Sequence, residues 1–175
     1  MRPLLAVLAL LSLCLVASCG GPKGPTMPDG SKIALLIVPD RGIEPGFNEG
    51  QISRRNQVGE WMEADLVKML RNQGYEPMLV QDPSQAQPGP GRYLLRVKIT
   101  NYNPGSKAAR MFGGIAGGVA GKCVLDTHYE LVGASGVMTA GDPSVSSSRD
   151  WNYSARKVNQ LTAQGVTDRF RQGLN

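Results

Sequence analysis

The chain has one histidine, and it lies between two acidic residues in a pattern typical of a strand. In CVLDTHYELV (123–132), Asp126, His128 and Glu130 would share one face of that strand. Carboxylates and an imidazole can bind a divalent metal. At roughly 3.3 Å per residue, however, the three positions spread over about 13 Å, which is wide for one ion. We therefore expect a solvated face there, with no metal and no cofactor other than a covalent lipid considered below.

A serine-rich stretch, SVSSSRD (144–150), offers nucleophiles that could act with His128. A single histidine leaves little general-base capacity at neutral pH. The serines more simply form a turn before a helix that Asn152 or Ser154 would cap. The sequence therefore predicts no catalytic residues, and a hydrolase is the least favoured of three functions.

A glycine-rich stretch, MFGGIAGGVAG (111–121), repeats glycine every four residues at Gly113, Gly117 and Gly121. A phosphate-binding loop would need a glycine and a hydroxyl where Ala116 and Cys123 stand. Small residues at this spacing instead allow close approach of two backbones. Three interpretations stay open: a compact connection packed on its own domain, a contact with a partner or another copy, and insertion into a bilayer. The candidate contact residues here are Gly113, Gly117, Gly121, Lys107 and Arg110.

The N-terminus, MRPLLAVLALLSLCLVASC, has the layout of an export signal, with Arg2 before an apolar run and small residues after it. Its end, Val16-Ala17-Ser18-Cys19, resembles the lipobox of bacterial lipoproteins. The resemblance implies cleavage before Cys19, a lipid on its sulfur and acylation of its new amino group. Gly20 in the next position resembles the pattern of outer-membrane sorting. We expect removal of residues 1–18 and a lipid-anchored domain facing the periplasm; an ordinary signal peptide or an uncleaved anchor is the alternative.

Loss of Arg2 with the signal lowers the formal net charge from +5 to +4. This mild excess suits anionic surfaces of the envelope, and nucleic acid is not an expected partner in that compartment. Cys14 would be removed and Cys19 lipidated, so Cys123 could form no disulfide within the mature chain. We expect Cys123 to be a small buried residue.

Residues 20–31 are rich in glycine and proline, which predicts a tether. The segment 19–31 would thus comprise the lipidated cysteine and its tether, and residues 32–175 would form a single domain. The apolar run 32–39 predicts a buried strand, and residues 40–55 a long loop. Four-residue apolar spacing over 56–73 predicts a helix that ends before a glycine, followed by a short strand at 76–81.

Two alternating segments, 92–102 and 123–132, predict paired antiparallel strands. The pairing would place Arg96 and Lys98 opposite Asp126 and Glu130 on the exposed face. A hairpin turn at 133–136 and a helix at 154–172 follow. The expected fold is α+β: a two-layer sandwich with a mainly antiparallel sheet and two helices on one face.

This order of elements, with RYLLRVKITNY at its centre, resembles a group of periplasmic lipoproteins over about residues 32–172. The group includes the ring lipoprotein of Pel polysaccharide export, the curli secretion lipoprotein and the lipoprotein activators of cell-wall synthases. More narrowly, GSKAARMFGGIAGGVAG followed by VLDTHYELV resembles a bacterial lipoprotein family of unknown function.

We therefore expect a non-enzymatic envelope lipoprotein that binds or scaffolds another envelope protein. It could instead assemble with its own copies into a ring that serves secretion or cell-wall assembly. The alternative is a direct binder of anionic glycan or lipid at the outer membrane. The candidate surfaces are the loop 40–55, residues 105–122 and the polar strand face, which carries Arg96, Lys98, Asp126, His128 and Glu130.

Overall fold

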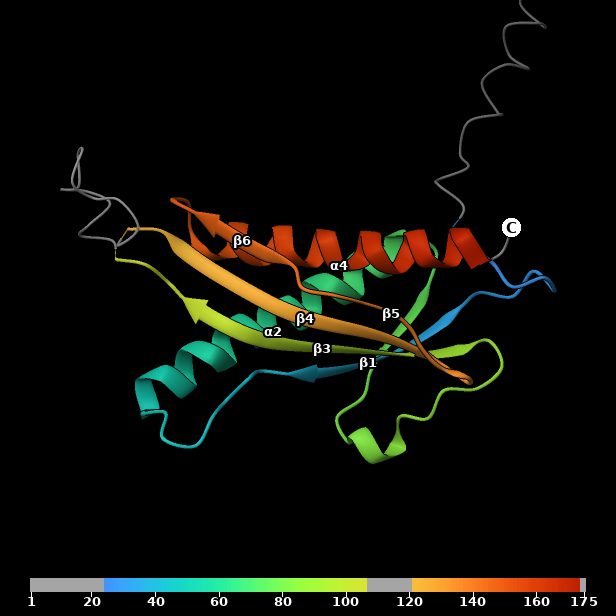
Figure 1. Ribbon diagram of the computed structural model, residues 1–175, viewed down its shortest axis with the longest axis horizontal. Helices are drawn as coiled ribbons and strands as arrows, with labels where there is room; N and C mark the ends of the chain where they lie inside the picture. Colours follow the sequence, from blue (N-terminus) through green and yellow to red (C-terminus); the bar gives the residue numbers. More distant parts are fainter. Residues whose placement is uncertain (1–23, 107–120, 174–175) are drawn as a thin grey trace, which may run out of the picture.

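The computed structural model describes residues 24–106 and 121–173. Their α+β fold has two helices beside one sheet, and it confirms the predicted class (Figure 1). In chain order the elements are β1 (Ala34–Asp40), α2 (Glu49–Asn72), β2 (Glu76–Leu79), the 3₁₀ turn η2 (Pro83–Gln85), β3 (Arg92–Asn103), β4 (Cys123–Gly133), β5 (Gly136–Gly141), β6 (Ser144–Ser147) and α4 (Trp151–Gly173).

The sheet is mixed, with the strand order β2-β1-β3-β4-β5, and β6 pairs with the far part of β4. Strand β4 is antiparallel to β3, β5 and β6, as the predicted hairpin and strand pair require. Strand β1 is parallel to both β2 and β3. The β1–α2–β2 segment is therefore a parallel crossover through a helix, which is the usual way to connect parallel neighbours.

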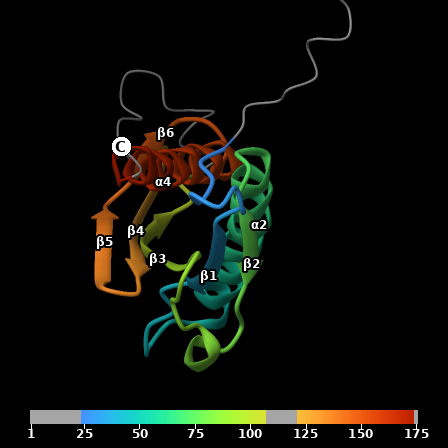
Figure 2. The same cartoon turned by 90° about the vertical axis from the view of Figure 1, so that its right-hand side faces the viewer.

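Both helices cover the same face of the sheet, which we call the inner face (Figure 2). They run side by side in one direction, because Trp61 in the middle of α2 packs on Trp151 at the start of α4, while Thr167 near the end of α4 donates to Gln73 at the end of α2. The two tryptophan rings lie 5.9 Å apart in an edge-to-face arrangement, as the expected packing roles require. Within residues 24–106 and 121–173, neither helix combines the length and apolar character needed to cross a bilayer.

The core lies between this helical layer and the inner face. Every second residue of the central strands points into it, and each fully buried leucine-sized side chain contributes about 1.5–3 kcal/mol. Its strand residues include Leu35, Ile37, Leu95, Val97, Ile99, Leu125, Tyr129 and Leu131, and its helix residues Val58, Met62, Leu66, Leu70, Val158, Val166 and Phe170. Cys123 is also fully buried, as predicted.

Helix α2 begins at Glu49, well before the predicted start at residue 56. Asn48 and Gln51 form a reciprocal capping box, in which the Asn48 side chain accepts from the Gln51 amide and Gln51 accepts from the Asn48 amide. Apolar spacing begins only at Val58, so the first turns carried no periodic signal. The loop predicted at 40–55 is therefore restricted to about residues 41–48.

The serines predicted as a turn instead form strand β6, so that prediction is wrong. The physical reason is pairing with β4, which gives their backbone groups partners and lets Ser144 Oγ donate to Asp126 Oδ1 at 2.6 Å. Helix α4 begins at Trp151, and Asn152 and Ser154 lie within it rather than capping it. Ser154 is fully buried because it faces the core.

A β-bulge at Thr100 interrupts the alternation of β3, since the register with β4 shifts between Ile99 and Asn101. Asn101 consequently returns to the exposed face and Tyr102 to the core side. The buried Arg55 of α2 donates to the Ile99 carbonyl at 3.2 Å, which gives the interrupted ladder a substitute donor.

The last part of the Gly/Pro-rich segment contacts the domain from Gly24 onward. Met27 and Ser31 close a turn, Thr26 bridges to Lys32, and Met27 packs against the core. Gly24 lies so close to the end of α2 that a Cβ on it would clash with the Gln73 carbonyl oxygen. The part of the predicted tether from 24 to 31 is thus held against the folded domain.

Strand β2 forms one edge of the sheet and contains a proline. The amides of Glu76 and Val80 donate to β1 at 2.9 Å. Because successive residues of a strand point their backbone groups to opposite sides, Pro77 faces away from the sheet. Its missing N–H therefore costs the sheet no hydrogen bond, as is typical of prolines in edge strands.

Candidate functional site

The face of the sheet opposite the helices, which we call the outer face, carries a strip of polar residues across β1, β3 and β4. Arg96 Nη1 lies 3.3 Å from Glu130 Oε2, as the predicted cross-strand pair requires. Lys98 does not face Asp126 or Glu130: it lies opposite His128, and its Nζ is 3.7 Å from Asp40 Oδ2. That part of the prediction is wrong, because the parallel neighbour β1 brings an unforeseen carboxylate beside Lys98.

Asp126 has its own partners on this strip. Its Oδ2 accepts from Asn101 Nδ2 at 2.9 Å, and its Oδ1 accepts from Ser144 Oγ at 2.6 Å. The bulge places Asn101 opposite Asp126, while β6 brings Ser144 to the same carboxylate. Asp126 is therefore engaged by partners different from those of His128 and Glu130.

His128 lies between two carboxylates. Its Nδ1 is 2.7 Å from Asp142 Oδ1, and its Nε2 is 3.6 Å from Glu130 Oε1. The hydrogen bond to Asp142 is the main cause that raises the pKa of His128 above its ordinary value, and Glu130 adds to the shift. In the described ranges, no group of His, Cys, Asp and Glu is arranged to hold a metal ion.

The strip has little capacity for an anionic ligand. Its cations Arg96 and Lys98 already lie beside carboxylates. All 14 acidic residues of the chain lie in the described ranges, whereas four of its 19 Lys and Arg residues lie outside them, namely Arg2, Lys23, Lys107 and Arg110. An anionic glycan on this face would have to compete with these ion pairs.

The single histidine makes the Asp142 contact directly measurable. We expect the imidazole of His128 to titrate above its ordinary pKa in an NMR titration, and closer to it in Asp142→Asn. Because the folded-state pKa is raised, the contact stabilises the domain below the unfolded pKa of about 6.5 and is lost as the pH rises through the folded value. The pair is exposed, so we expect at most about 1 kcal/mol.

Urea denaturation at several pH values checks the sign. The stability difference between the wild type and His128→Gln should shrink as the pH rises from 5.5 to 8. An NMR titration in which Asp142→Asn leaves the His128 pKa unchanged would contradict the assignment.

An apolar row crosses the outer face beside the polar strip, with one residue from each of five adjacent strands. The register places Met78, Leu36, Leu94, Val132 and Val137 side by side in that order. The middle of the row is covered by Ala86 from the β2–β3 connection, so Leu36 and Leu94 are 8% and 3% exposed. The ends, Met78 on β2 and Val137 on β5, are 63% and 60% exposed.

The two exposed ends were not among the predicted site residues. Both lie in short strands whose position at the edges depends on the sheet order. From the sequence, an apolar residue in a short strand is expected to be buried. The exposure of these two residues becomes evident only once the strand order places β2 and β5 at the edges of the sheet.

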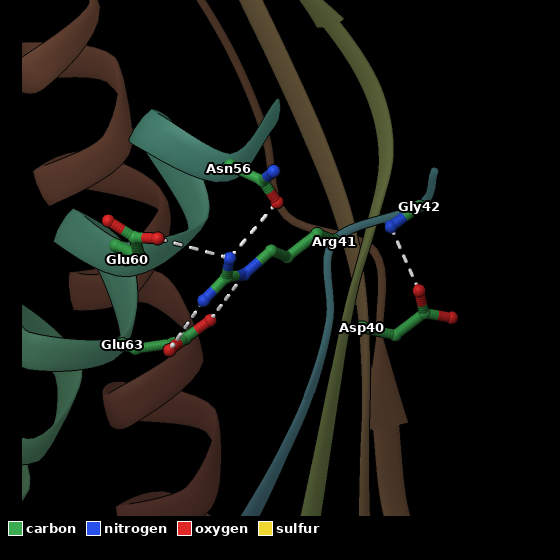
Figure 3. Close-up of polar contacts among 6 residues, drawn as sticks. All are labelled: Asp40, Arg41, Gly42, Asn56, Glu60 and Glu63. Atoms are coloured by element: carbon green, nitrogen blue, oxygen red, sulfur yellow. Dashed lines mark hydrogen bonds and ion pairs between the residues drawn. The ribbon is translucent and has the colours of Figure 1, made fainter. Parts of the chain in front are cut away.

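The loop between β1 and α2, a predicted partner surface, is fixed by an arginine at its start (Figure 3). Arg41 binds Glu63 through two hydrogen bonds of 3.0 and 3.3 Å, and its Nη1 also donates to Asn56 and Glu60. The Glu63 hydrogen bond raises the pKa of the Arg41 guanidinium. Asp40 accepts from the amide of Gly42 at 2.8 Å, where the chain turns with a φ of +60°. These contacts hold the loop to α2.

Behind Arg41 lies a cavity of about 20 Å³. Its lining includes Ile37, Met62 and Val97 from the core. A space of this size holds about one water molecule. This cavity is therefore too small for a small-molecule ligand. On its other side, Arg41 and Glu63 line an open hollow of about 380 Å³ together with Leu79.

Most of the glycine-rich candidate surface lies outside the described residues, including Lys107, Arg110, Gly113 and Gly117. Gly121 is described and is buried at the start of β4. Its carbonyl oxygen would lie 2.8 Å from a Cβ on Gly105, so the two backbone segments approach closely there.

No protein-family model matches the sequence, and no curated protein matches it. Among solved structures the chain is similar to PelC from Paraburkholderia phytofirmans, a dodecamer, with 18% identity and a TM-score of 0.49 over 83% of this chain and 92% of that one. It is also similar to a minor lipoprotein from Acinetobacter baumannii, with 14% identity and a TM-score of 0.38 over 81% and 92% of the two chains. At such identities the likeness says nothing about ligand, partner or assembly.

Proposed function

We propose that this chain is a non-catalytic envelope lipoprotein, anchored by lipid at Cys19, whose domain assembles side by side with further copies of itself. The observation that carries the proposal is the apolar row. Its two exposed ends, Met78 and Val137, lie on opposite edges of the sheet and are connected by one continuous line of register partners. The lipobox-like Val16-Ala17-Ser18-Cys19 supports the anchor, and Gly20 supports the outer membrane.

A neighbour placed edge to edge would bring Met78 of one copy against Val137 of the next and so continue the row. The two patches are different surfaces, so the contact is head-to-tail and closes into a ring if the rotation per copy allows it. Pro77 faces outward on β2 and can donate no hydrogen bond across such a contact. Side chains would therefore carry a larger share of the contact than they do between two complete edge strands.

Light scattering on a soluble form that begins at Gly20 tests this assembly. We expect an oligomer for the wild type and a monomer for Met78→Glu and for Val137→Glu, because each variant puts a charge into an apolar contact. A penalty of roughly 3 kcal/mol for that desolvated charge would weaken association by about 100-fold.

Mixing the two variants gives the sharpest outcome. Met78→Glu keeps its β5 edge and Val137→Glu keeps its β2 edge, so the mixture should form dimers and nothing larger. Leu161→Glu, at an exposed apolar position on α4, is the matched control and should leave the oligomer intact. A strictly monomeric wild type at high concentration would remove the proposal.

A further inference from the structure

The first described residue, Gly24, lies beside the C-terminal ends of α2 and α4. Gly24 abuts Gln73, and Gly24 and Pro25 line a groove with Met69 of α2 and Thr167 of α4. The N-terminal segment, drawn in blue, lies beside α4 in Figure 1 and between α4 and α2 in Figure 2. A membrane anchor that precedes Gly24 in the chain is therefore attached to the domain at the C-terminal ends of the helices.

Only residues 20–23 separate the proposed lipid attachment at Cys19 from Gly24, which makes five residue-to-residue steps. Five residues span at most about 18 Å when fully extended. Helix α2, with 24 residues, is about 36 Å long. The anchor thus keeps the C-terminal ends of the helices within about 18 Å of the membrane surface, which is about half the length of α2.

The C-terminal turns of the two helices expose more cations than anions. We call this end of the domain the helix-end surface and define it by Lys68, Arg71 and Arg171, together with Asp168 in the same groove region. Lys23 directly precedes Gly24 in the sequence. Cations in the last turn of a helix are favoured by the helix dipole.

We propose that the helix-end surface lies against the anionic headgroups of the phospholipid bilayer, with α2 and α4 directed away from the membrane. The proposal rests on the proposed lipidation of Cys19. Each cation held near an anionic surface favours the bound orientation by roughly fivefold. With the helices upright, the β2 and β5 edges point sideways in the plane of the membrane, where neighbouring copies would meet them.

Fluorescence quenching on the full lipidated chain in vesicles tests the orientation. Asn72→Cys and Gln57→Cys each add one exposed thiol on α2, about 22 Å apart along the helix. Cys123 is buried and Cys19 would carry lipid, so the label goes to the new position. With quencher on the lipid headgroups and phosphatidylglycerol in the vesicles, we expect at least threefold stronger quenching at residue 72 than at residue 57.

Charge variants then test the cause. The triple variant Lys68→Gln, Arg71→Gln, Arg171→Gln should lose most of this difference, and vesicles of phosphatidylcholine alone should reduce it for the wild type. The control Arg54→Gln, Lys122→Gln, Lys157→Gln removes the same charge from other exposed positions and should keep the difference. Equal quenching at both labels in anionic vesicles would overturn the orientation. A chain that does not float with vesicles at all would instead overturn the lipid anchor.

Discussion

Replacing Gly165 with alanine is expected to destabilise the domain by about 2–3 kcal/mol, although alanine is the better helix former by about 1 kcal/mol. Gly165 lies within α4, and a Cβ on it would clash with the phenolic oxygen of Tyr129 on β4. On the opposite side, a Cβ on Gly141 would come within 2.7 Å of the same ring. The two glycines therefore form a slot for Tyr129, which is 6% exposed.

Urea denaturation of Gly165→Ala measures the effect, and Gln164→Ala at the exposed neighbouring position is the control, expected within about 0.5 kcal/mol of the wild type. Adding Tyr129→Phe to Gly165→Ala removes the clashing oxygen and should recover part of the loss. Stability equal to or above that of the wild type in the single variant would show that Tyr129 does not occupy the slot.

Replacing Cys19 with alanine is expected to move the protein from the membrane fraction to the soluble fraction. Each buried methylene contributes about 0.8 kcal/mol to membrane binding, so several acyl chains on one cysteine make attachment effectively permanent. Without the sulfur no thioether lipid can form. Fractionation of cells that express each form measures the change, and mass spectrometry of the native protein should find lipid on residue 19.

The chain supplies a matched control for this experiment. Cys14→Ala changes a cysteine within the predicted signal and should leave the protein in the membrane fraction. A Cys19→Ala protein that stays with membranes after high-salt washing, or native protein with Met1 intact, would contradict the lipid anchor.

Local patterns predicted the central elements well. Alternation in residues 92–102 and 123–132 identified the two long strands, and it placed Arg96 against Glu130 on the exposed face. Four-residue spacing identified both helices. These predictions succeed because the residues of a strand or helix face share one environment, and that environment repeats along the sequence.

What the sequence could not indicate depends on contacts between distant segments. The pairing of Lys98 with Asp40 depends on a parallel β1, and the position of Asn101 opposite Asp126 depends on one bulged residue. The apolar row is visible only when five strands are in register, so Met78 and Val137 could not be singled out. The first turns of α2 did carry a signal, because Asn48 and Gln51 have capping-box spacing, but periodicity alone does not detect it.

Pro77 on β2 also bears on how far the proposed assembly can grow. A continuous hydrogen-bonded ladder between a β2 edge and a β5 edge needs amide donors from both strands, and the outward position at residue 77 has none. Any ladder between copies that meet through Met78 and Val137 is therefore interrupted at this position and holds them less firmly than a complete one. Pro77 in the edge strand β2 thus works against the growth of fibres through paired edge strands.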